Sequence, residues 1–267
     1  MHLKVSGIDE AGRGSVFGSL IVVGVTLDEE SLNNLVKSGL KDSKLFSGSQ
    51  GQKKRVKLAL RIQELALESK IIEIPAYKID RTLANRPKDN LNFLEIRKIG
   101  QIVNELSSED ITIDSISKPL YFRKHLITHL NRLDKSLTIK MESHKPGATS
   151  FSIRGAGSDL KRIVISEKAD RIYPIVSAAS CVAKYVRDKH LREIEKTWNL
   201  PPFCLGQGYP NEKDSKVMNF LQKYHEDIQN RRFPFIRYSW SWLPLQKIVR
   251  APLKTLEEFL DGQKNED

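Results

Sequence analysis

The stretch that decides the fold is Gly7-Ile8-Asp9-Glu10-Ala11-Gly12-Arg13-Gly14. The alternating residues 3–8 before it predict a β-strand, and Asp9 continues their parity, so that a carboxylate extends the buried face. The apolar run 19–26 predicts a neighbouring strand, joined through the Gly-rich turns near residues 12–18. Two adjacent anions, Asp9 and Glu10, repel at a half-buried strand end, and this raises carboxyl pKa values unless a cation is present.

Outward from this stretch, the patterns of strands and helices alternate. Further strands are expected at residues 70–75 and 111–114 and, more weakly, at 137–141 and 161–166. Helices are expected at residues 54–67, 90–106, 120–133, 174–198, 211–225 and 252–260. The segment 144–158 is rich in Ser and Gly and is expected to be a long surface loop. The alternation predicts an α/β fold with a mixed sheet and with helices gathered toward the C-terminus.

The composition is that of a globular protein. The chain has 267 residues with 39% apolar and 29% charged residues, and its mean hydropathy is −0.41. It contains no run of 18 apolar residues, so we expect no membrane span, and its first residues lack the apolar core of a signal peptide. The two cysteines, Cys181 and Cys204, favour reduced thiols and hence a cytoplasmic location.

The charge favours an anionic partner. Lys and Arg number 44 against 33 Asp and Glu, for a net charge of +11. The last thirteen residues are acidic, which makes the rest of the chain more basic still. Such an excess favours a polyanion, because each Lys or Arg near a phosphate releases a condensed counterion. Charge alone does not separate a nucleic-acid enzyme from a ribosome-binding or membrane-surface protein.

Two further carboxylates stand at expected element ends. Asp114 closes the strand at 111–114, and Asp170 stands just before the helix that Pro174 opens. Since neighbouring strands lie about 4.8 Å apart, acids at adjacent strand ends can share one metal ion or bridge two. Mg²⁺ and Mn²⁺ are the natural counter-ions because hard divalent cations take carboxylate oxygens. The alternative is a set of ordinary solvated acids.

Basic and aromatic residues add two patterns. Ser177, Ser180, Lys184 and Arg187 fall on one face of the helix at 174–198, where the basic pair can hold phosphates; the alternative is a polar solvent face. Tyr209 lies in a Gly-rich turn, where its ring can stack on a sugar or base or simply pack within the loop. The chain has no Walker-type phosphate loop and no nucleophile elbow.

Several separated motifs together resemble the ribonuclease HII family, the type 2 ribonucleases H. In the order of that family they are GIDEAGRG at 7–14, DSK at 42–44, NLNFLE at 90–95, ITID at 111–114, KADRIYPIVSAASCVAKYVRD at 168–188 and GQGYP at 206–210. The resemblance runs from about residue 3 to residue 245. The late RYSW at 237–240 is more similar to the archaeal and eukaryotic branch than to the bacterial one.

The resemblance implies a ribonuclease H-like fold, a five-stranded mixed sheet flanked by helices with a C-terminal helical extension. It implies a catalytic domain at 1–198, a helical substrate-binding part at 199–250 and an acidic tail at 251–267. The family cleaves the RNA strand of RNA–DNA hybrids, and duplex DNA at embedded ribonucleotides, leaving 3′-hydroxyl and 5′-phosphate ends. Its cofactors would be Mg²⁺ or Mn²⁺ in a two-metal site.

Carried over by position, the family's functional residues fall into three groups. Its four catalytic, metal-binding acids would be Asp9, Glu10, Asp114 and Asp170. Its ribose-reading turn would be Gly12, Arg13 and Gly14, with Tyr209 as the sugar-stacking residue. Lys44, Lys184 and Arg187 match positions near the nucleic-acid backbone. The chain departs from the family at Ser15 and Ser19, where proline is usual, and its loop at 142–160 is longer than usual.

The C-terminal tail contains one more pattern. Residues 253–260 resemble a sliding-clamp-binding peptide whose anchors would be Leu256, Phe259 and Leu260. The alternative is a terminal amphipathic helix that packs on its own domain. Rival functions are a nuclease of this fold that needs several consecutive ribonucleotides, and a non-catalytic or multi-subunit hybrid-binding protein. A monomer is expected.

Overall fold

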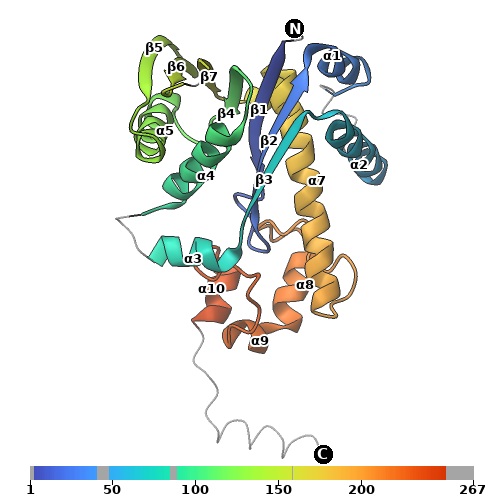
Figure 1. Cartoon of the computed structure of the whole chain (residues 1–267). Coiled ribbons are helices and arrows are strands. Elements are labelled where there is room, and N and C mark those ends of the chain that lie inside the picture. Colours follow the sequence, from blue (N-terminus) through green and yellow to red (C-terminus); the bar gives the residue numbers. More distant parts are fainter. Residues whose placement is uncertain (1–2, 41–47, 85–88, 158, 251–267) are drawn as a thin grey trace, which may run out of the picture.

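The computed structural model describes residues 3–40, 48–84, 89–157 and 159–250 (Figure 1). Its strands are β1 (Lys4–Ala11), β2 (Leu20–Asp28), β3 (Glu68–Ile74), β4 (Asp110–Asp114), β5 (Thr138–Lys145), β6 (Ala148–Arg154) and β7 (Lys161–Ser166). Its helices are α1 (Glu29–Lys37), α2 (Gly48–Leu65), α3 (Ala76–Ala84), α4 (Leu91–Glu105), α5 (Pro119–Leu133), α6 (Ala169–Ile172), α7 (Pro174–Thr197), α8 (Ser215–Lys223), α9 (His225–Gln229) and α10 (Leu243–Val249). The predicted α/β class, with a mixed sheet flanked by helices, is confirmed.

The sheet brings the ends of β1 and β4 together. Its strand order is β3-β2-β1-β4-β7-β6-β5, in which β4 runs parallel to both β1 and β7 while the other neighbours are antiparallel. Ile8 of β1 is paired with Ile113 of β4. The next residue on each strand is an aspartate, so the register itself sets Asp9 beside Asp114.

The expectation of five strands is corrected to seven in the part of the chain that the structure describes. The predicted loop at 144–158 was wrong, because most of it belongs to β5 and β6, which form a hairpin around Gly147. Phe151 and Ile153 of β6 reach the apolar core. Thr149, Ser150 and Ser152, which suggested a loop, are buried with hydrogen-bond partners, as in the bond of 2.9 Å between Ser150 Oγ and the Oγ of the exposed Ser143.

Each face of the sheet carries its own helical layer and core. Buried side chains of α4 and α5, such as Leu94 and Leu126, cover one face of the sheet, where they pack in one cluster with Ile8 of β1. Those of α1, α2 and α7 cover the other face. α7 lies so close to β1 that a Cβ on Gly7 would come within 2.3 Å of the Ile175 carbonyl oxygen. Gly7 therefore permits the contact that sets α7 beside the acidic strand.

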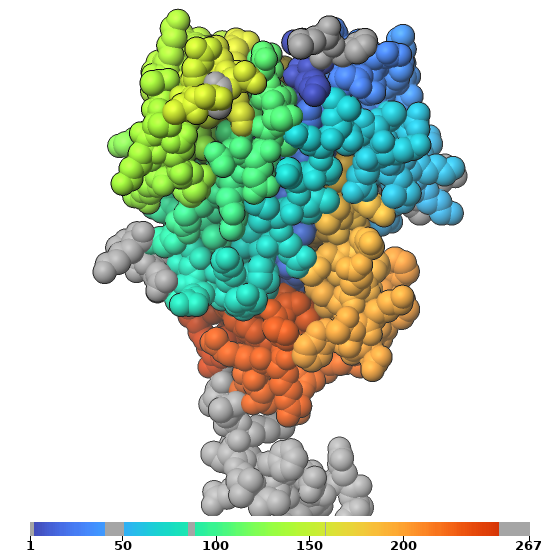
Figure 2. Space-filling model, viewed as in Figure 1, coloured from blue at the N-terminus to red at the C-terminus, as the bar shows by residue number. Residues whose placement is uncertain are grey.

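The C-terminal residues form a third core cluster. Leu200, Phe220 and other apolar side chains of residues 200–245 pack with Phe17, from the loop after β1, and with Leu191 of α7. In Figure 2 these residues, in orange and red, lie against α3 and the end of α7. Residues 15–19 of the loop after β1 are therefore buried between the sheet layer and the C-terminal part.

Most of the predicted helices are present, with shifted ends. Asn90 caps α4 by accepting a hydrogen bond from the Phe93 N–H at 3.1 Å. The pattern at 211–225 corresponds to α8 and α9, with a break at Tyr224. α1, α3 and α10 are short helices that periodicity did not predict. The predicted helix at 252–260 lies outside the described residues.

Among the helices described, none combines the length and the apolar composition that a bilayer crossing requires.

Candidate active site

Three carboxylates meet where β1 and β4 end. Asp9 and Glu10 are consecutive on β1, and Asp114 is the last residue of β4. Asp9 is only 6% exposed, accepts the Glu10 N–H at 2.8 Å, and forms a side-chain hydrogen bond with Ser180 of α7. The unusual placement of an acid on the buried face of a strand therefore holds in the fold.

These acids lie close together with little positive charge to neutralise them. The pKa of Asp9 is raised well above its usual value by burial, by Glu10 and by Asp114. Burial, followed by the charges of Glu95 and Asp114, raises the pKa of Glu10 to about 7. Burial also raises the pKa of Asp114. The Oε2 atom of Glu10 is buried and has no hydrogen-bond partner among the described residues. Each carboxylate therefore makes ionisation of its neighbours costlier.

Asp170 joins this group through Asp114. It lies in the first turn of α6, directly after β7, the parallel neighbour of β4. The Oδ1 atom of Asp114 accepts the backbone N–H of Ala169 at 2.5 Å, and the N–H of Asp170 also donates to this carboxylate. The negative charge of Asp170 in turn raises the pKa of Asp114. The structure thus brings all four sequence-predicted acids to one edge of the sheet.

The four acids fit a hard divalent cation. Within the described ranges, no three His, Cys, Asp or Glu side chains are already arranged as a metal-binding group. The donor chemistry nevertheless suits Mg²⁺ or Mn²⁺, which take carboxylate oxygens and keep several waters. The orphaned Glu10 Oε2 and the mutual repulsion of Asp9, Glu10 and Asp114 are the features that a bound cation would relieve.

The turn after β1 is anchored through the side chain of Arg13. Its Nε atom lies 2.8 Å from Oε2 of Glu95 on α4, and its guanidinium also donates to Asn92. Glu95 is fully buried, and burial raises its pKa to about 7 against the opposing effect of Arg13. The Arg13 side chain is thus directed into the protein, whereas the neighbouring Gly14 is exposed.

The same turn is held from the C-terminal part. The guanidinium of Arg237, which is fully buried, donates to the Arg13 carbonyl at 2.8 Å and to the Gly18 carbonyl at 3.0 and 3.1 Å. The indole N–H of Trp240 donates to the Gly14 carbonyl at 3.3 Å. In the sequence, the motifs around Arg237, Trp240 and Glu95 indicated only a family resemblance. The contacts that give them a role join residues 82 to 226 positions apart.

Arg187 connects the turn with the loop that carries Tyr209. It is 3% exposed and donates to Ser15 Oγ at 2.8 Å and to the Gln207 carbonyl. Its guanidinium carbon lies 4.8 Å from the centre of the Tyr209 ring. That ring is 39% exposed and would lie 3.9 Å from a Cβ on Gly14. The buried Arg187 therefore positions the two loops, and Tyr209 presents its ring beside the turn.

Ser15 and Ser19, the two departures from the family pattern, are both buried and bonded. Ser15 Oγ lies 2.8 Å from the Gly208 carbonyl and so ties the turn to the loop of Tyr209. Ser19 Oγ donates to Glu73 on β3 at 2.7 Å and lies 3.1 Å from His190 Nε2 of α7. Tertiary hydrogen bonds thus fix this turn at both serines.

The remaining sequence-predicted residues are placed less centrally. Lys184 is exposed, and its ammonium group donates at 2.8 Å to Ser180, the hydrogen-bond partner of Asp9. Lys44 lies outside the described residues, as do the tail anchors Leu256, Phe259 and Leu260.

Comparisons with known proteins show the family of the chain. The model of the ribonuclease HII family matches residues 6–242. Ribonuclease HII of Methanosphaera stadtmanae is 33% identical over 238 residues, which cover 89% of this chain and 92% of that protein. Ribonuclease HII of Pyrococcus furiosus is 31% identical over 260 residues, covering 96% of this chain and 98% of that protein.

Solved structures give the same result. The ribonuclease H2 of Pyrococcus horikoshii OT3 superposes with a TM-score of 0.66 at 25% identity, covering 93% of this chain and 100% of that one. The ribonuclease HII from a complex with PCNA of Archaeoglobus fulgidus has a TM-score of 0.65 at 25% identity, covering 96% and 100%. A ribonuclease HIII solved with Mn²⁺ shares the fold at 17% identity, with a TM-score of 0.62 and coverage of 93% and 70%. Taken with the acidic edge and the turn beside it, these matches show that the chain belongs to the ribonuclease HII family, hydrolases that cleave the RNA of RNA–DNA hybrids.

Proposed function

We propose that this protein is a divalent-metal-dependent endonuclease that also cleaves duplex DNA at embedded ribonucleotides, leaving 5′-phosphate and 3′-hydroxyl ends. The observation that carries the proposal is the set of buried, mutually repelling carboxylates Asp9, Glu10 and Asp114, beside a turn with an exposed glycine. Such a set is costly without a cation and is well suited to phosphoryl transfer with one.

Asp9, Glu10, Asp114 and Asp170 are the residues that would hold Mg²⁺ or Mn²⁺. When bound, such ions lower the pKa of a water molecule and neutralise the charge on the leaving 3′-oxygen. Ser180 fixes the direction of the Asp9 carboxylate, and the backbone N–H of Ala169 fixes that of Asp114. The chain therefore supplies a preorganised set of oxygen ligands and needs no covalent nucleophile.

The turn Gly12-Arg13-Gly14 would distinguish RNA from DNA. The carbonyls of Arg13 and Gly14 already accept hydrogen bonds from Arg237 and Trp240. We therefore expect the amide N–H groups of the turn to meet the ribose 2′-hydroxyl, the group that separates the two backbones. The exposed ring of Tyr209 would pack against the neighbouring sugar, and Lys184 would lie near the phosphates.

A cleavage assay tests this function. The substrate is a DNA duplex with one embedded ribonucleotide, incubated with the full chain in Mg²⁺, in Mn²⁺ and in EDTA. We expect a cut on the 5′ side of the ribonucleotide only when a divalent cation is present, and no cut by Asp9→Asn although that variant still binds the duplex. Near-normal turnover by Asp9→Asn would contradict the assignment. Cleavage only of substrates with several consecutive ribonucleotides would favour the rival function, a nuclease of this fold that needs such a run.

The tail would contact a sliding clamp. The structural relative from Archaeoglobus fulgidus was solved as a complex of PCNA and ribonuclease HII, which supports this extension. Leu256, Phe259 and Leu260 would be the anchors. Calorimetry of the full chain against a sliding clamp should show micromolar binding that Leu256→Ala/Phe259→Ala removes. Equal heats from both proteins would instead favour a tail that packs on its own domain.

We also propose a cytoplasmic monomer that acts without partner subunits. The presence of all four acids argues against a non-catalytic hybrid-binding protein. Light scattering of the purified chain, measured alongside the cleavage assay, tests this proposal: an active species of about 30.5 kDa supports it, and activity confined to a larger assembly contradicts it.

A further inference from the structure

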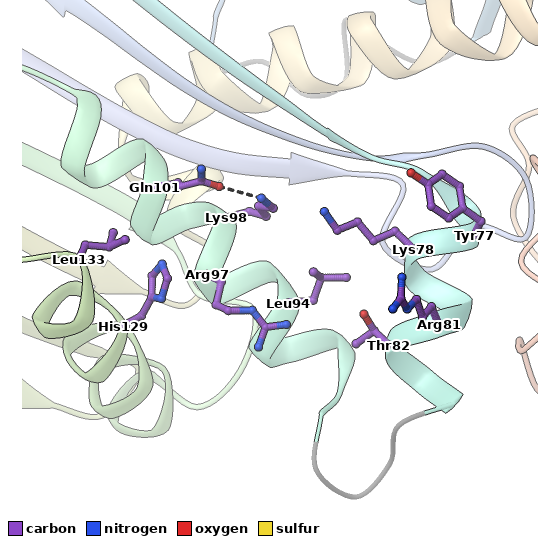
Figure 3. A pocket seen from close by; sticks show the side chains of 10 residues that line it. All are labelled: Tyr77, Lys78, Arg81, Thr82, Leu94, Arg97, Lys98, Gln101, His129 and Leu133. Carbon is purple, nitrogen blue, oxygen red and sulfur yellow. Dashed lines mark hydrogen bonds between the residues drawn. The ribbon is translucent and has the colours of Figure 1, made fainter.

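A basic concavity lies between α3, α4 and α5, and none of the four acids lines it. Its volume is about 600 Å³ (Figure 3). Lys78 and Arg81 line it from α3, and Arg97 and Lys98 line it from α4. In Figure 3 the side chain of Lys78 extends from α3 toward α4, so the cations of the two helices face a common space. The chemistry proposed above uses none of these residues.

Most of this positive charge is not neutralised. Arg97 pairs with Asp89 at 2.8 Å. Among the described residues, Lys78, Arg81 and Lys98 form no ion pair, and the ammonium group of Lys98 donates to the neutral Gln101 at 2.7 Å. Burial, together with the charges of Lys78 and Arg97, lowers the pKa of Lys98. The cations thus repel one another, and an anion placed among them would relieve that repulsion.

The helices that line the concavity also support the turn beside the acids. On α4, Glu95 binds the Arg13 side chain at 2.8 Å. On α3, Asp80 accepts the backbone N–H groups of Tyr238 and Ser239 at 3.0 and 3.1 Å. These residues belong to the segment whose Arg237 holds the Arg13 carbonyl. The basic concavity and the turn are therefore connected through the same two helices.

We propose that this concavity binds the phosphate backbone of the duplex outside the cleaved nucleotide. The inference rests on the proposed function, since the same duplex would occupy the acidic edge. Four cations distributed over two helices suit a chain of phosphates better than one compact anion, which needs donors that converge on a point. The ring of Tyr77, which lines the same space and is 63% exposed, adds a surface for a sugar or an unpaired base.

The test compares the wild type with the variant Lys78→Ala/Arg81→Ala/Lys98→Ala. Binding is measured in Ca²⁺ on duplexes of about 10 and about 30 base pairs, roughly 34 and 100 Å long, each with one ribonucleotide. For the long duplex we expect Kd to rise about tenfold near 0.1 M salt, and the slope of log K against log salt to shrink by about 2 to 3. The turnover number in Mg²⁺ at saturating substrate should not change.

The matched control removes three cations from the opposite face of the sheet. Lys37→Ala on α1 is combined with Lys54→Ala and Lys57→Ala on α2, all three exposed residues. We expect a smaller loss of long-duplex binding in this control, although its net charge changes equally. Thermal unfolding of both variants, compared with the wild type, shows that each remains folded.

Three outcomes would overturn the inference. The first is an unchanged salt slope in the variant of the concavity, and the second is an equal loss of binding in the control. The third is a shift of backbone NMR signals around Lys78 by millimolar inorganic phosphate without any loss of duplex binding in the variant, which would assign the concavity to a free anion. Cleavage of the short duplex by the wild type tests the proposed function separately, so the two failures are distinguishable.

Discussion

Arg237 donates a hydrogen bond from Nη1 to the backbone carbonyl of Arg13 at 2.8 Å, across 224 positions of sequence. The side chain of Arg13 in turn binds Glu95 on α4 at 2.8 Å. The turn after β1 is thus fixed at its backbone by the C-terminal part and at its side chain by the sheet layer. Its conformation depends on both parts being in place.

Arg237→Ala should therefore weaken both stability and substrate binding. It removes hydrogen bonds to the Arg13 and Gly18 carbonyls from a fully buried site, which we expect to cost about 2 to 4 kcal/mol of unfolding free energy. Urea titration measures the loss of unfolding free energy, and a rise in KM measures the effect of a less ordered turn on substrate binding. Arg232→Ala is the control, because Arg232 is 68% exposed and its pair with Asp227 is worth under about 1 kcal/mol. Equal effects of the two substitutions would contradict the role of Arg237.

Gly12→Ala should abolish cleavage. Gly12 has a φ of +86°, and a Cβ there would lie 2.5 Å from Arg187 Nε and 3.0 Å from the Ser19 carbonyl oxygen. Gly157 is a matched position, since its φ is +74° but a Cβ would meet no atom within 4 Å. Gly157→Ala should cost only the backbone strain of about 1 to 2 kcal/mol and leave the activity intact. Similar activities of the two variants would show that the turn tolerates the close contact.

In the absence of divalent cations, the wild type should lose stability as the pH rises from about 5 to 8. The pKa of Glu10 is raised from its usual value near 4.5 to about 7, so between these values the folded protein binds more protons than the unfolded chain. The unfolding free energy falls over that window. Glu10→Gln should reduce the pH dependence and leave the part that comes from Glu95, whose pKa is also raised to about 7, whereas Glu64→Gln, at a side chain that is 67% exposed, should not reduce it. Denaturant titrations in EDTA at several pH values measure both effects.

Asp9→Asn should stabilise the protein above pH 7 while removing its activity. Burial and the neighbouring acids raise the pKa of Asp9, so its ionised form costs folding free energy at neutral pH, and an amide removes that cost. In EDTA we expect a higher unfolding free energy than that of the wild type at pH 8 and a smaller difference at acidic pH.

Mg²⁺ provides the complementary measurement. It should raise the melting temperature of the wild type more than that of Asp9→Asn, since a ligand stabilises only the state that binds it. An equal shift in both proteins would mean that Asp9 does not hold the ion.

Local sequence patterns predicted those parts of the structure that are determined by residues close together in the sequence. The parity that placed Asp9 on a buried face was enough to expect an acidic strand end, and the β1–β4 register then aligned it with Asp114. The hairpin of β5 and β6 was missed because its buried Ser and Thr residues read as a loop until their hydrogen-bond partners were known.

The supports of the turn were not predictable for a different reason. Glu95, Arg237 and Trp240 act through contacts with residues 13 and 14, and no periodicity or spacing reports contacts over 82 to 226 positions. A buried arginine also has the same local pattern as an exposed one. Composition does not predict the basic concavity either, because it gives the number of charged residues but not that the cations of α3 and α4 face each other.

The outer strand β5 has a consequence for association between molecules. It is the last strand of the sheet, so its free edge is open to pairing with another chain. Its pairing with β6 is irregular between Met141 and Ser143, and exposed charges at Lys140, Glu142 and Lys145 stand along it. Irregular pairing and charged side chains discourage edge-to-edge growth. The β5–β6 hairpin thus widens the sheet without leaving a smooth apolar edge from which fibrils or precipitates would form.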